Sequence, residues 1–144
     1  MSDIPKDFSP LVRSSPFLDL LGPVYSKREK GILVLGLRIE KKHCNTRGFA
    51  HGGLLATLAD AGLGSGVAFS REPPIPLVTA SLTTDFAGSA QIGDWVEARI
   101  EIQKSGRRLA FANAYLSVDG KRIVRASAVF SVTNVLHPSM GGAE

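Results

Sequence analysis

The sequence predicts an α+β fold in which an antiparallel sheet packs against one long helix. Residues 48–70 form an almost uncharged stretch, GFAHGGLLATLADAGLGSGVAFS, whose leucines and alanines recur at helical spacing. The second half of the chain carries four consecutive segments with strand patterns, separated by turn signals. A helix that is apolar on nearly every face belongs in a core, so we expect the sheet to wrap around it.

Length and composition predict a single domain over residues 1–144. We expect a core at about 15–134, a flexible arm over 1–10 and a flexible tail over 135–144. The one cysteine, Cys44, excludes an intrachain disulfide and fits a reducing compartment. No cationic start followed by an apolar run is present at the N-terminus, so we expect a cytoplasmic location. Six glycines, His51 and Asp60 in the central stretch argue against a membrane span.

Charge and residue spacing narrow the classes of partner. Seventeen Lys and Arg against thirteen Asp and Glu give a net charge of +4, which suits a polyanionic small molecule as well as nucleic acid. The basic residues are spread along the chain and form no nucleic-acid-binding motif with aromatic residues. The histidines, His43, His51 and His137, are scattered, and no metal-ligand spacing or phosphate-binding loop is present. We therefore expect no metal, no cofactor and no nucleic-acid partner.

The first part of the chain predicts one short helix and two strands. The Ser-Pro start and the terminal glycine of residues 14–22 favour a helix. A short strand is expected around 24–26, with a turn at 28–31. Residues 32–40 are apolar on both faces at first, which is typical of a strand inside a sheet. A polar loop at 41–47 then leads into the long helix.

The second part predicts a meander of strands. A proline-rich connection over 71–76 cannot continue the helix. The alternation of apolar and charged residues in the second strand indicates a half-exposed sheet position, and Asp119-Gly120 is a strong hairpin signal. The four expected strands are 77–86, 95–104, 109–118 and 122–132.

The start and the middle of the long helix carry the residues that could take part in binding or catalysis. His51 precedes Gly52 and Gly53, which leave the backbone bare at a helix start, where unpaired N–H groups suit an anion or a polarised carbonyl. Asp60 is the single acid of the stretch, and a buried carboxylate is costly unless it is paired, hydrogen-bonded or used. A structural acid and a catalytic acid both remain open for Asp60 on this pattern alone.

The run from Asn45 to Gly53, NTRGFAHGG, with Asp60 further along the same helix, resembles the hotdog-fold acyl-CoA thioesterases of the phenylacetate-degradation type, which are 4-hydroxybenzoyl-CoA thioesterase-like. The likeness covers roughly residues 15–134. It implies a hotdog fold and a hydrolase that converts an acyl-CoA to a free acid and CoA. It also implies a homodimer whose two sheets join edge to edge, often paired into a homotetramer. The acyl group remains open between aromatic groups, such as phenylacetyl or hydroxybenzoyl, and medium chains.

The resemblance also implies roles for single residues. The Gly52 N–H would polarise the thioester carbonyl, an interaction worth about 3 kcal/mol, and Asn45 would orient polar groups of the site. Asp60 would act as nucleophile or general base, with its pKa raised by an apolar wall. Thr79 falls where the family supplies a hydroxyl that positions water, although β-propensity alone also explains a threonine in a strand.

Further residues are implied at the substrate. His51 and Gly53 would contact it at the helix start, with capping or packing as the alternative for His51. Phe17 and Leu21 of the short helix are candidates for contact with the acyl group, or for core packing. The run KSGRRLA resembles the family's turn beside the nucleotide end of CoA, so Arg107 or Arg108 would contact phosphate, unless this is only a solvated hairpin tip.

Helix geometry predicts that two subunits share each site. Gly52 and Asp60 are eight residues apart, which is about 12 Å along a helix axis and too far for both to act on one thioester. Two antiparallel helices related by a two-fold axis would bring each Gly52 beside the partner's Asp60. Two other functions remain open: a non-catalytic acyl-CoA binding module, and a hotdog acyl-thioester dehydratase, whose His-Phe-Pro-Gly type of run is absent here.

Overall fold

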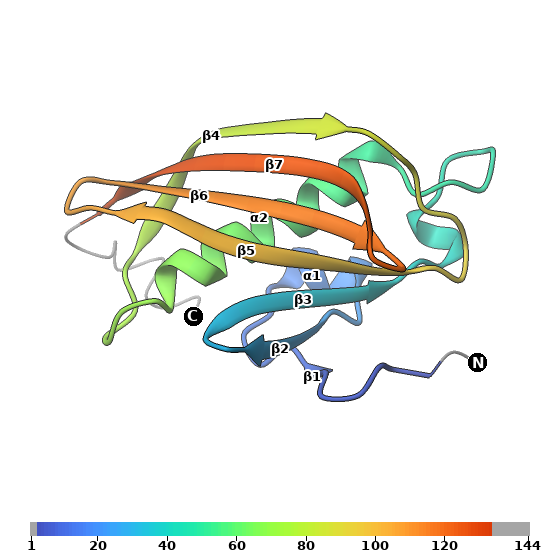
Figure 1. The fold of residues 1–144 in the computed structure, drawn as a ribbon, viewed down its shortest axis with the longest axis horizontal. Helices are drawn as coiled ribbons and strands as arrows, with labels where there is room; N and C mark the ends of the chain where they lie inside the picture. Colours follow the sequence, from blue (N-terminus) through green and yellow to red (C-terminus); the bar gives the residue numbers. More distant parts are fainter. Residues whose placement is uncertain (1–2, 134–144) are drawn as a thin grey trace.

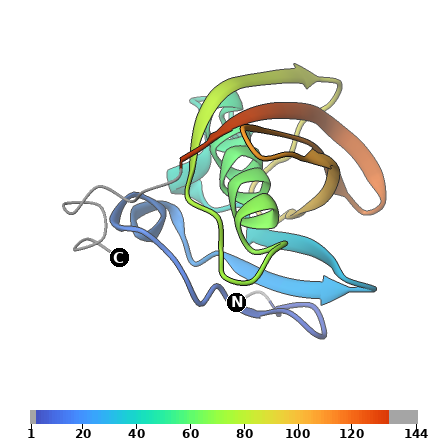
Figure 2. The ribbon, with the colours of Figure 1, turned by 90° about the vertical axis from the view of Figure 1, so that its left-hand side faces the viewer.

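The computed structural model describes residues 3–133, in which one curved antiparallel sheet holds a long helix against its inner face (Figure 1). The sheet has seven strands in the order β1-β2-β3-β5-β6-β7-β4. Figure 2 shows the sheet curving around α2 from β4 on one side to β2 on the other, so the α+β prediction is confirmed. The elements are β1 (Ser9–Pro10), α1 (Pro16–Leu21), β2 (Tyr25–Glu29), β3 (Ile32–Arg38), the 3₁₀ turn η1 (Lys41–His43), α2 (Gly52–Ala68), β4 (Leu77–Phe86), β5 (Trp95–Ser105), β6 (Leu109–Val118) and β7 (Lys121–Val132).

The strand predictions hold closely, with differences at β2 and at β3, which ends at Arg38, two residues before the predicted end at residue 40. β4 and β6 have the predicted bounds, and β5 and β7 are each one residue longer. β2 continues to Glu29, beyond the predicted strand, because the following turn takes only Lys30 and Gly31, both at positive φ (53° and 81°). Two central residues of this kind form the tight hairpin turn that matches strand twist. The predicted tail at 135–144 lies outside the described residues.

From Phe8 onward the N-terminal arm contacts the sheet: the Phe8 ring lies against Trp95 on the outer face, and Ser9–Pro10 forms β1, one edge strand of the sheet. The sequence predicts a flexible arm over 1–10. The Phe8 ring meets the Trp95 ring edge-on, with 5.1 Å between their centroids, and Ser9–Pro10 pairs with β2. The Arg38 guanidinium lies 5.0 Å from the Trp95 ring centroid and donates to the backbone carbonyl of Asp3. Aromatic and cation–π contacts therefore hold the arm on the sheet.

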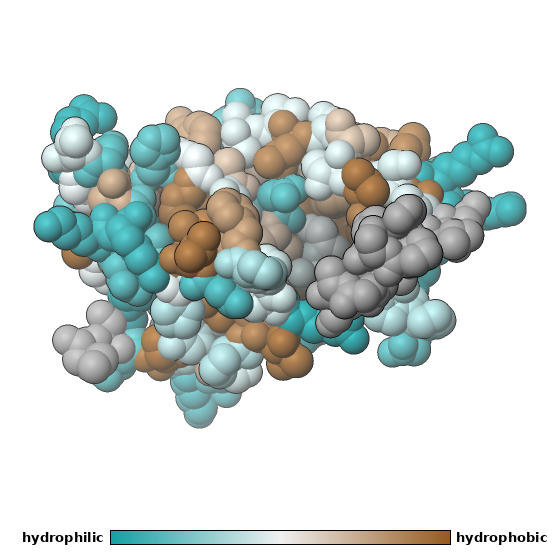
Figure 3. Space-filling view, turned by 180° about the vertical axis from the view of Figure 1, so that it is seen from behind, coloured by the Kyte–Doolittle hydropathy of each residue, from teal (hydrophilic) through white to brown (hydrophobic). Residues whose placement is uncertain are grey.

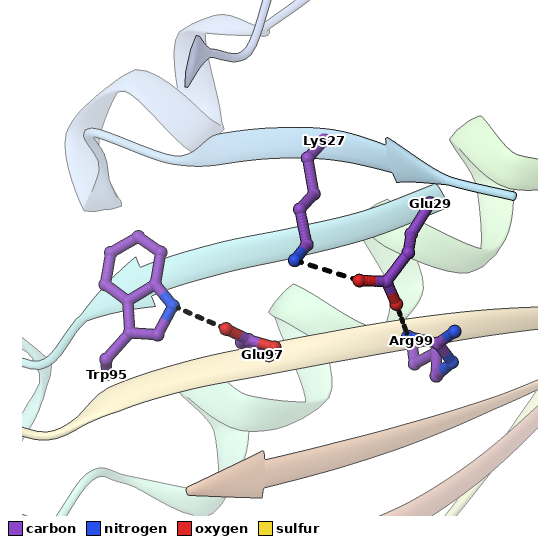
Figure 4. Close-up of polar contacts among 5 residues, drawn as sticks. All are labelled: Lys27, Glu29, Trp95, Glu97 and Arg99. Atoms are coloured by element: carbon purple, nitrogen blue, oxygen red, sulfur yellow. Dashed lines mark hydrogen bonds and ion pairs between the residues drawn. The ribbon is translucent and has the colours of Figure 1, made fainter. Parts of the chain in front are cut away.

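A network of polar side chains crosses the same outer face (Figure 4). Glu29 accepts from Arg99 at 2.7 Å and from Lys27 at 3.3 Å. Lys27 of β2 and Arg99 of β5 both pair with Val34 of β3, from its two sides. The network therefore spans β2, β3 and β5. Arg99 above all, and then Lys27, hold the pKa of the Glu29 carboxyl below its ordinary value of 4.5.

The long helix α2 packs closely on the sheet because two of its glycines, Gly62 and Gly66, face β5. A Cβ added at Gly62 or Gly66 would lie 2.8 Å or 2.7 Å from side-chain carbons of Ile100. The prediction that this helix is buried all round is wrong for a single chain, since the side of the helix that carries Ala56 and Asp60 is only half-buried. The sheet of one chain reaches around only part of the helix circumference (Figure 2).

Apolar side chains remain exposed beside this open helix face. Seen from the side opposite to Figure 1, the surface shows several apolar patches among polar ones (Figure 3). β4 is the edge strand and pairs only with β7, yet its Leu82 and Phe86 are 36% and 50% exposed, and Phe17 of α1 is 57% exposed. Within residues 3–133, every helix is too short or too polar to cross a lipid bilayer.

Candidate functional site

Asp60 lies at the floor of an apolar groove between α1, α2 and β4. Its Oδ1 accepts a hydrogen bond of 3.2 Å from the Thr79 hydroxyl of β4. The groove has a volume of about 470 Å³, and apolar side chains including Phe17, Leu18 and Leu82 line it beside these two polar residues. The structure therefore brings together Asp60 and Thr79, two of the site residues that the family resemblance implies, and places Phe17 beside them.

A β-bulge in β4 sets which side chains face this groove. The pairing of β4 with β7 shifts register between Thr79 and Ser81, so that one extra residue enters the strand. Such a bulge reverses the alternation of side chains beyond it. Thr79 and Leu82, which strict alternation would put on opposite faces, therefore both line the groove. Simple period-two reasoning cannot find Leu82 as a groove residue.

The start of α2 presents a backbone amide without an internal partner. His51 caps the helix, because its Nδ1 accepts from the Gly53 N–H at 3.1 Å, and its carbonyl accepts from Leu54. Among residues 3–133 the Gly52 N–H has no hydrogen-bond acceptor. The Phe86 ring flanks this amide, since a Cβ added at Gly52 would lie 3.5 Å from it. The sequence pattern identifies Gly52 but gives no sign of Phe86.

Asn45 shapes the loop that leads to this helix start. Its Oδ1 accepts from the backbone N–H groups of Arg47 at 2.9 Å and of Phe49 at 3.2 Å. This is the side-chain-to-backbone pattern by which asparagine stabilises tight turns. Within one chain, the position of Gly52 thus depends on Asn45 through the backbone between them.

The two predicted catalytic groups of one chain stand apart. Gly52 and Asp60 belong to one uninterrupted helix, which separates them by about 12 Å along its axis. A reacting carbonyl needs both groups at about 3 Å. The structure of one chain therefore does not bring Gly52 and Asp60 to a common point.

Arg107 and Arg108 lie at the other end of the molecule, in the exposed turn between β5 and β6. Together with Arg71 they line a polar hollow of about 900 Å³. Arg71, which no motif identifies, donates to the Ser105 carbonyl at 2.7 Å and to the Gly106 carbonyl at 3.0 Å, and so holds the turn. This turn lies at the C-terminal end of α2, roughly 24 Å along the helix from Gly52.

No side-chain cluster in the part of the chain that the structure describes has the ligands for a metal. Over residues 3–133, no group of three or more His, Cys, Asp or Glu side chains could hold a metal ion. Cys44 is half-buried in the loop beside Asn45, and its thiol lies 3.4 Å from the Glu40 carbonyl. The chemistry available at the groove is that of the Asp60 carboxylate and of the hydroxyls of Ser15, Thr57 and Thr79, whereas the Gly52 amide lies at the start of the helix.

Comparison with known proteins adds to this geometry. Residues 47–124 match the family described as the thioesterase superfamily. A Pseudomonas aeruginosa protein that is named provisionally as an esterase is 53% identical over 131 residues, covering 90% of this chain and 98% of that protein. Acyl-coenzyme A thioesterase 13 of Mus musculus is 32% identical over 85 residues, covering 59% of this chain and 60% of that protein. The structure of zebrafish thioesterase superfamily member 2 matches with a TM-score of 0.76 at 28% identity, covering 83% of this chain and 88% of that chain.

Proposed function

Because this chain belongs to the thioesterase superfamily and has the hotdog fold of that family, we propose that it hydrolyses an acyl-CoA to a free acid and CoA. The observation that carries this proposal is the Asp60–Thr79 pair in an apolar groove. Such a groove can receive an acyl chain while the carboxylate stays within reach of its carbonyl carbon. The likeness to an acyl-coenzyme A thioesterase supports acyl-CoA as the substrate class.

The proposed chemistry divides the work between a backbone amide and a carboxylate. The Gly52 N–H donates to the thioester oxygen and stabilises the negative charge that develops there, an effect worth about 3 kcal/mol. Asp60 either takes a proton from a water molecule whose oxygen attacks the carbonyl carbon, or attacks that carbon itself to form an anhydride that water then hydrolyses to the free acid. The C–S bond breaks, and the CoA sulfur becomes the thiol by taking up the proton that the water gives up. Thr79 holds the Asp60 carboxylate, or the attacking water, in position.

The proposal includes a homodimer in which each site uses both chains. The separation between Gly52 and Asp60 in one helix requires a second helix beside the first. The exposed side chains Leu82 and Phe86 and the unpaired edge of β4 offer a surface on which a second copy could pair strand to strand. A two-fold axis there would set the start of each helix beside the middle of the other and would give two equal sites. Pairing of such dimers into a tetramer is part of the same proposal.

The same arrangement gives a role to the arginines of the β5–β6 turn. In an antiparallel pair of helices, the C-terminal end of one helix lies beyond the start of the other. Arg107 and Arg108 of one chain would then lie beyond the partner's Gly52. The phosphates of a bound CoA would leave the site on that side. The groove volume of about 470 Å³ fits an aromatic acyl group of the phenylacetyl or hydroxybenzoyl kind, or a medium chain. The lone Cys44 fits a cytoplasmic location.

A panel of acyl-CoAs tests the proposed function. The protein is incubated with acetyl-, phenylacetyl-, 4-hydroxybenzoyl- and long-chain acyl-CoA in the presence of a thiol reagent, with the Asp60→Asn variant as the matched control. We expect the wild-type protein to release thiol from at least one substrate and the variant to release none above background. Thermal protection by an acyl-CoA without turnover would overturn the proposal in favour of a binding module.

A further inference from the structure

His43 is a buried polar side chain, only 2% exposed, and both of its ring nitrogens have partners. Its Nδ1 accepts from the Glu40 N–H at 2.8 Å, and its Nε2 lies 2.5 Å from the Leu21 carbonyl oxygen. An amide N–H can only donate and a carbonyl can only accept, so these partners require the neutral ring with its hydrogen on Nε2. The Nε2–H therefore donates to Leu21.

This ring joins the short helix α1 to the loop that precedes α2. Leu21 is the last residue of α1, and His43 ends η1, two residues before Asn45. The His43 carbonyl also accepts from the His51 N–H at 2.8 Å, directly before Gly52. One residue thus contacts both the end of α1 and the backbone that sets the start of the long helix.

The short helix α1 has few other constraints on its position. None of its residues is buried, although Leu21 packs against the edge of the core. Its N-terminal cap is internal, since the Ser15 hydroxyl accepts from the Leu18 N–H at 3.2 Å. Its C-terminal end is bound from outside by His43 and by Lys42, whose Nζ donates to the Gly22 carbonyl at 2.6 Å.

We propose that His43 is a positioning residue for the selection of the acyl group. Its hydrogen bond to Leu21 holds α1 so that Phe17 and Leu18 form a fixed wall of the groove that contains Asp60. This inference rests on the proposed function, because it takes the groove that contains Asp60 as the site of the acyl group. His43 does not itself line the groove, so its effect on substrates passes through α1.

Two substitutions separate the two hydrogen bonds of the ring. In His43→Gln the side-chain amide NH₂ can take the place of Nε2–H, which keeps the bond to Leu21. In His43→Asn the side-chain carbonyl can take the place of Nδ1, which keeps the bond from Glu40 but loses Leu21. Both variants replace the ring by a smaller amide, so each is the control for the other.

The readouts are amide hydrogen exchange of residues 17–21 and kcat/KM for bulky acyl-CoAs relative to acetyl-CoA. Loss of one hydrogen bond should speed exchange in α1 of His43→Asn by about three- to tenfold. We expect the selectivity ratio of this variant to shift toward bulky acyl groups by a similar factor, with kcat for acetyl-CoA changed less than about twofold. His43→Gln should stay close to wild type in both measurements.

Equal effects of the two variants would mean that the ring only fills space, and would overturn the inference while thioester hydrolysis stands. If neither variant folds, Lys42→Met replaces them, because it removes the other hydrogen bond that holds the end of α1, the one to the Gly22 carbonyl. It should change hydrogen exchange in α1 and acyl selectivity in the same direction as His43→Asn. No change in either would overturn the inference. A wild-type protein that hydrolyses no acyl-CoA would overturn the proposed function instead. Acyl selectivity is then measured as Kd by thermal shift, and exchange in α1 is read as before.

Discussion

The Thr79 hydroxyl donates a 3.2 Å hydrogen bond to Oδ1 of Asp60 and so joins the edge strand β4 to the middle of the long helix. This contact depends on the bulge after Thr79, which also turns Leu82 into the same groove. Because Asp60 is only half-buried in one chain, its carboxylate is not needed to satisfy a closed core. Loss of its charge should therefore affect chemistry more than folding.

The Asp60→Asn variant should lose hydrolysis and keep its fold. The amide can still accept from Thr79 but cannot act as a base or a nucleophile, so kcat should fall by about 10²- to 10⁴-fold. Thermal unfolding and steady-state kinetics measure the two effects on the same sample. Near-normal kcat would remove Asp60 from the mechanism, and unfolding would identify it as a structural acid.

Gly52→Ala should reduce catalysis without harm to stability. An added Cβ would lie 3.5 Å from the Phe86 ring, an ordinary contact, but the methyl group would crowd a carbonyl that approaches the amide. A carbonyl kept out of reach of such a donor loses its hydrogen bond, which lowers kcat by about 10²-fold or more. Gly64→Ala in the same helix is the matched control, because its Cβ would meet only the Phe130 side chain of β7, at 3.9 Å. Equal kinetics of the two variants would contradict the role of Gly52.

Local patterns predict most of the secondary structure, because they depend on neighbours in sequence. The alternation along β5 and the Asp119-Gly120 turn, whose residues have φ of 49° and 80°, are examples that the structure confirms. The capping of α2 by His51 also follows from its place directly before the helix. Nothing in the spacing of Asp60 and Thr79 predicts their contact, and the family resemblance implies only that both belong to the site.

The remaining features depend on contacts between distant parts of the chain. The N-terminal arm is held by the contact of Phe8 with Trp95. The role of His43 depends on its hydrogen bond to Leu21, which lies 22 residues earlier in the chain. The half-buried face of α2 could not be predicted from its apolar sequence, because composition does not say whether one chain or two provide the covering surface. A second copy over that face would explain both the apolar pattern and its exposure here.

Replacing both Arg107 and Arg108 by Ala should raise KM for acyl-CoA far more than KM for an acyl-pantetheine thioester. Only acyl-CoA carries the nucleotide phosphates that exposed guanidinium groups would bind. Lys121→Ala with Arg122→Ala is the matched control, since it removes the same charge from the β6–β7 hairpin. Equal effects of the arginine pair on both substrates would place these residues away from the phosphates.

The network around Glu29 should make stability depend on pH. Arg99 and Lys27 lower the pKa of Glu29 in the folded chain. The contribution of the Glu29 carboxylate to the free energy of unfolding is therefore complete above the ordinary pKa of 4.5. It is lost as the pH falls through the lowered pKa of the folded chain. Glu29→Gln should therefore be less stable than wild type at pH 7, by an amount that shrinks in strongly acidic solution.

Urea unfolding over a pH series, at low and at high salt, measures this difference. Salt should reduce it because these side chains are partly exposed. Glu101→Gln is the control, since Glu101 is exposed on the same strand as Arg99 and forms no ion pair within residues 3–133. A pH-independent difference between wild type and Glu29→Gln would mean that packing, not charge, accounts for the role of Glu29.

Two inactive variants should restore activity to each other if each site is built from two chains. Asn45→Ala disturbs the loop that sets Gly52, because Asn45 accepts from the Arg47 and Phe49 N–H groups. Asp60→Ala removes the carboxylate. The two proteins are unfolded together and refolded, and activity is measured per site. Random pairing makes half of the dimers mixed, and both lesions then fall in one of the two sites, so about a quarter of the wild-type sites should return.

Each variant refolded alone is the control and should stay inactive, which excludes recovery by refolding itself. Mass spectrometry under native conditions measures the fraction of mixed dimers, so the expected activity follows from a measured number. Activity proportional to that fraction would place Asn45 and Asp60 of one site on different chains, as the 12 Å or so between Gly52 and Asp60 along one helix requires. Mixed dimers without activity would mean that both residues serve one chain, and a bend or shift of α2 would then be needed to bring Gly52 to Asp60.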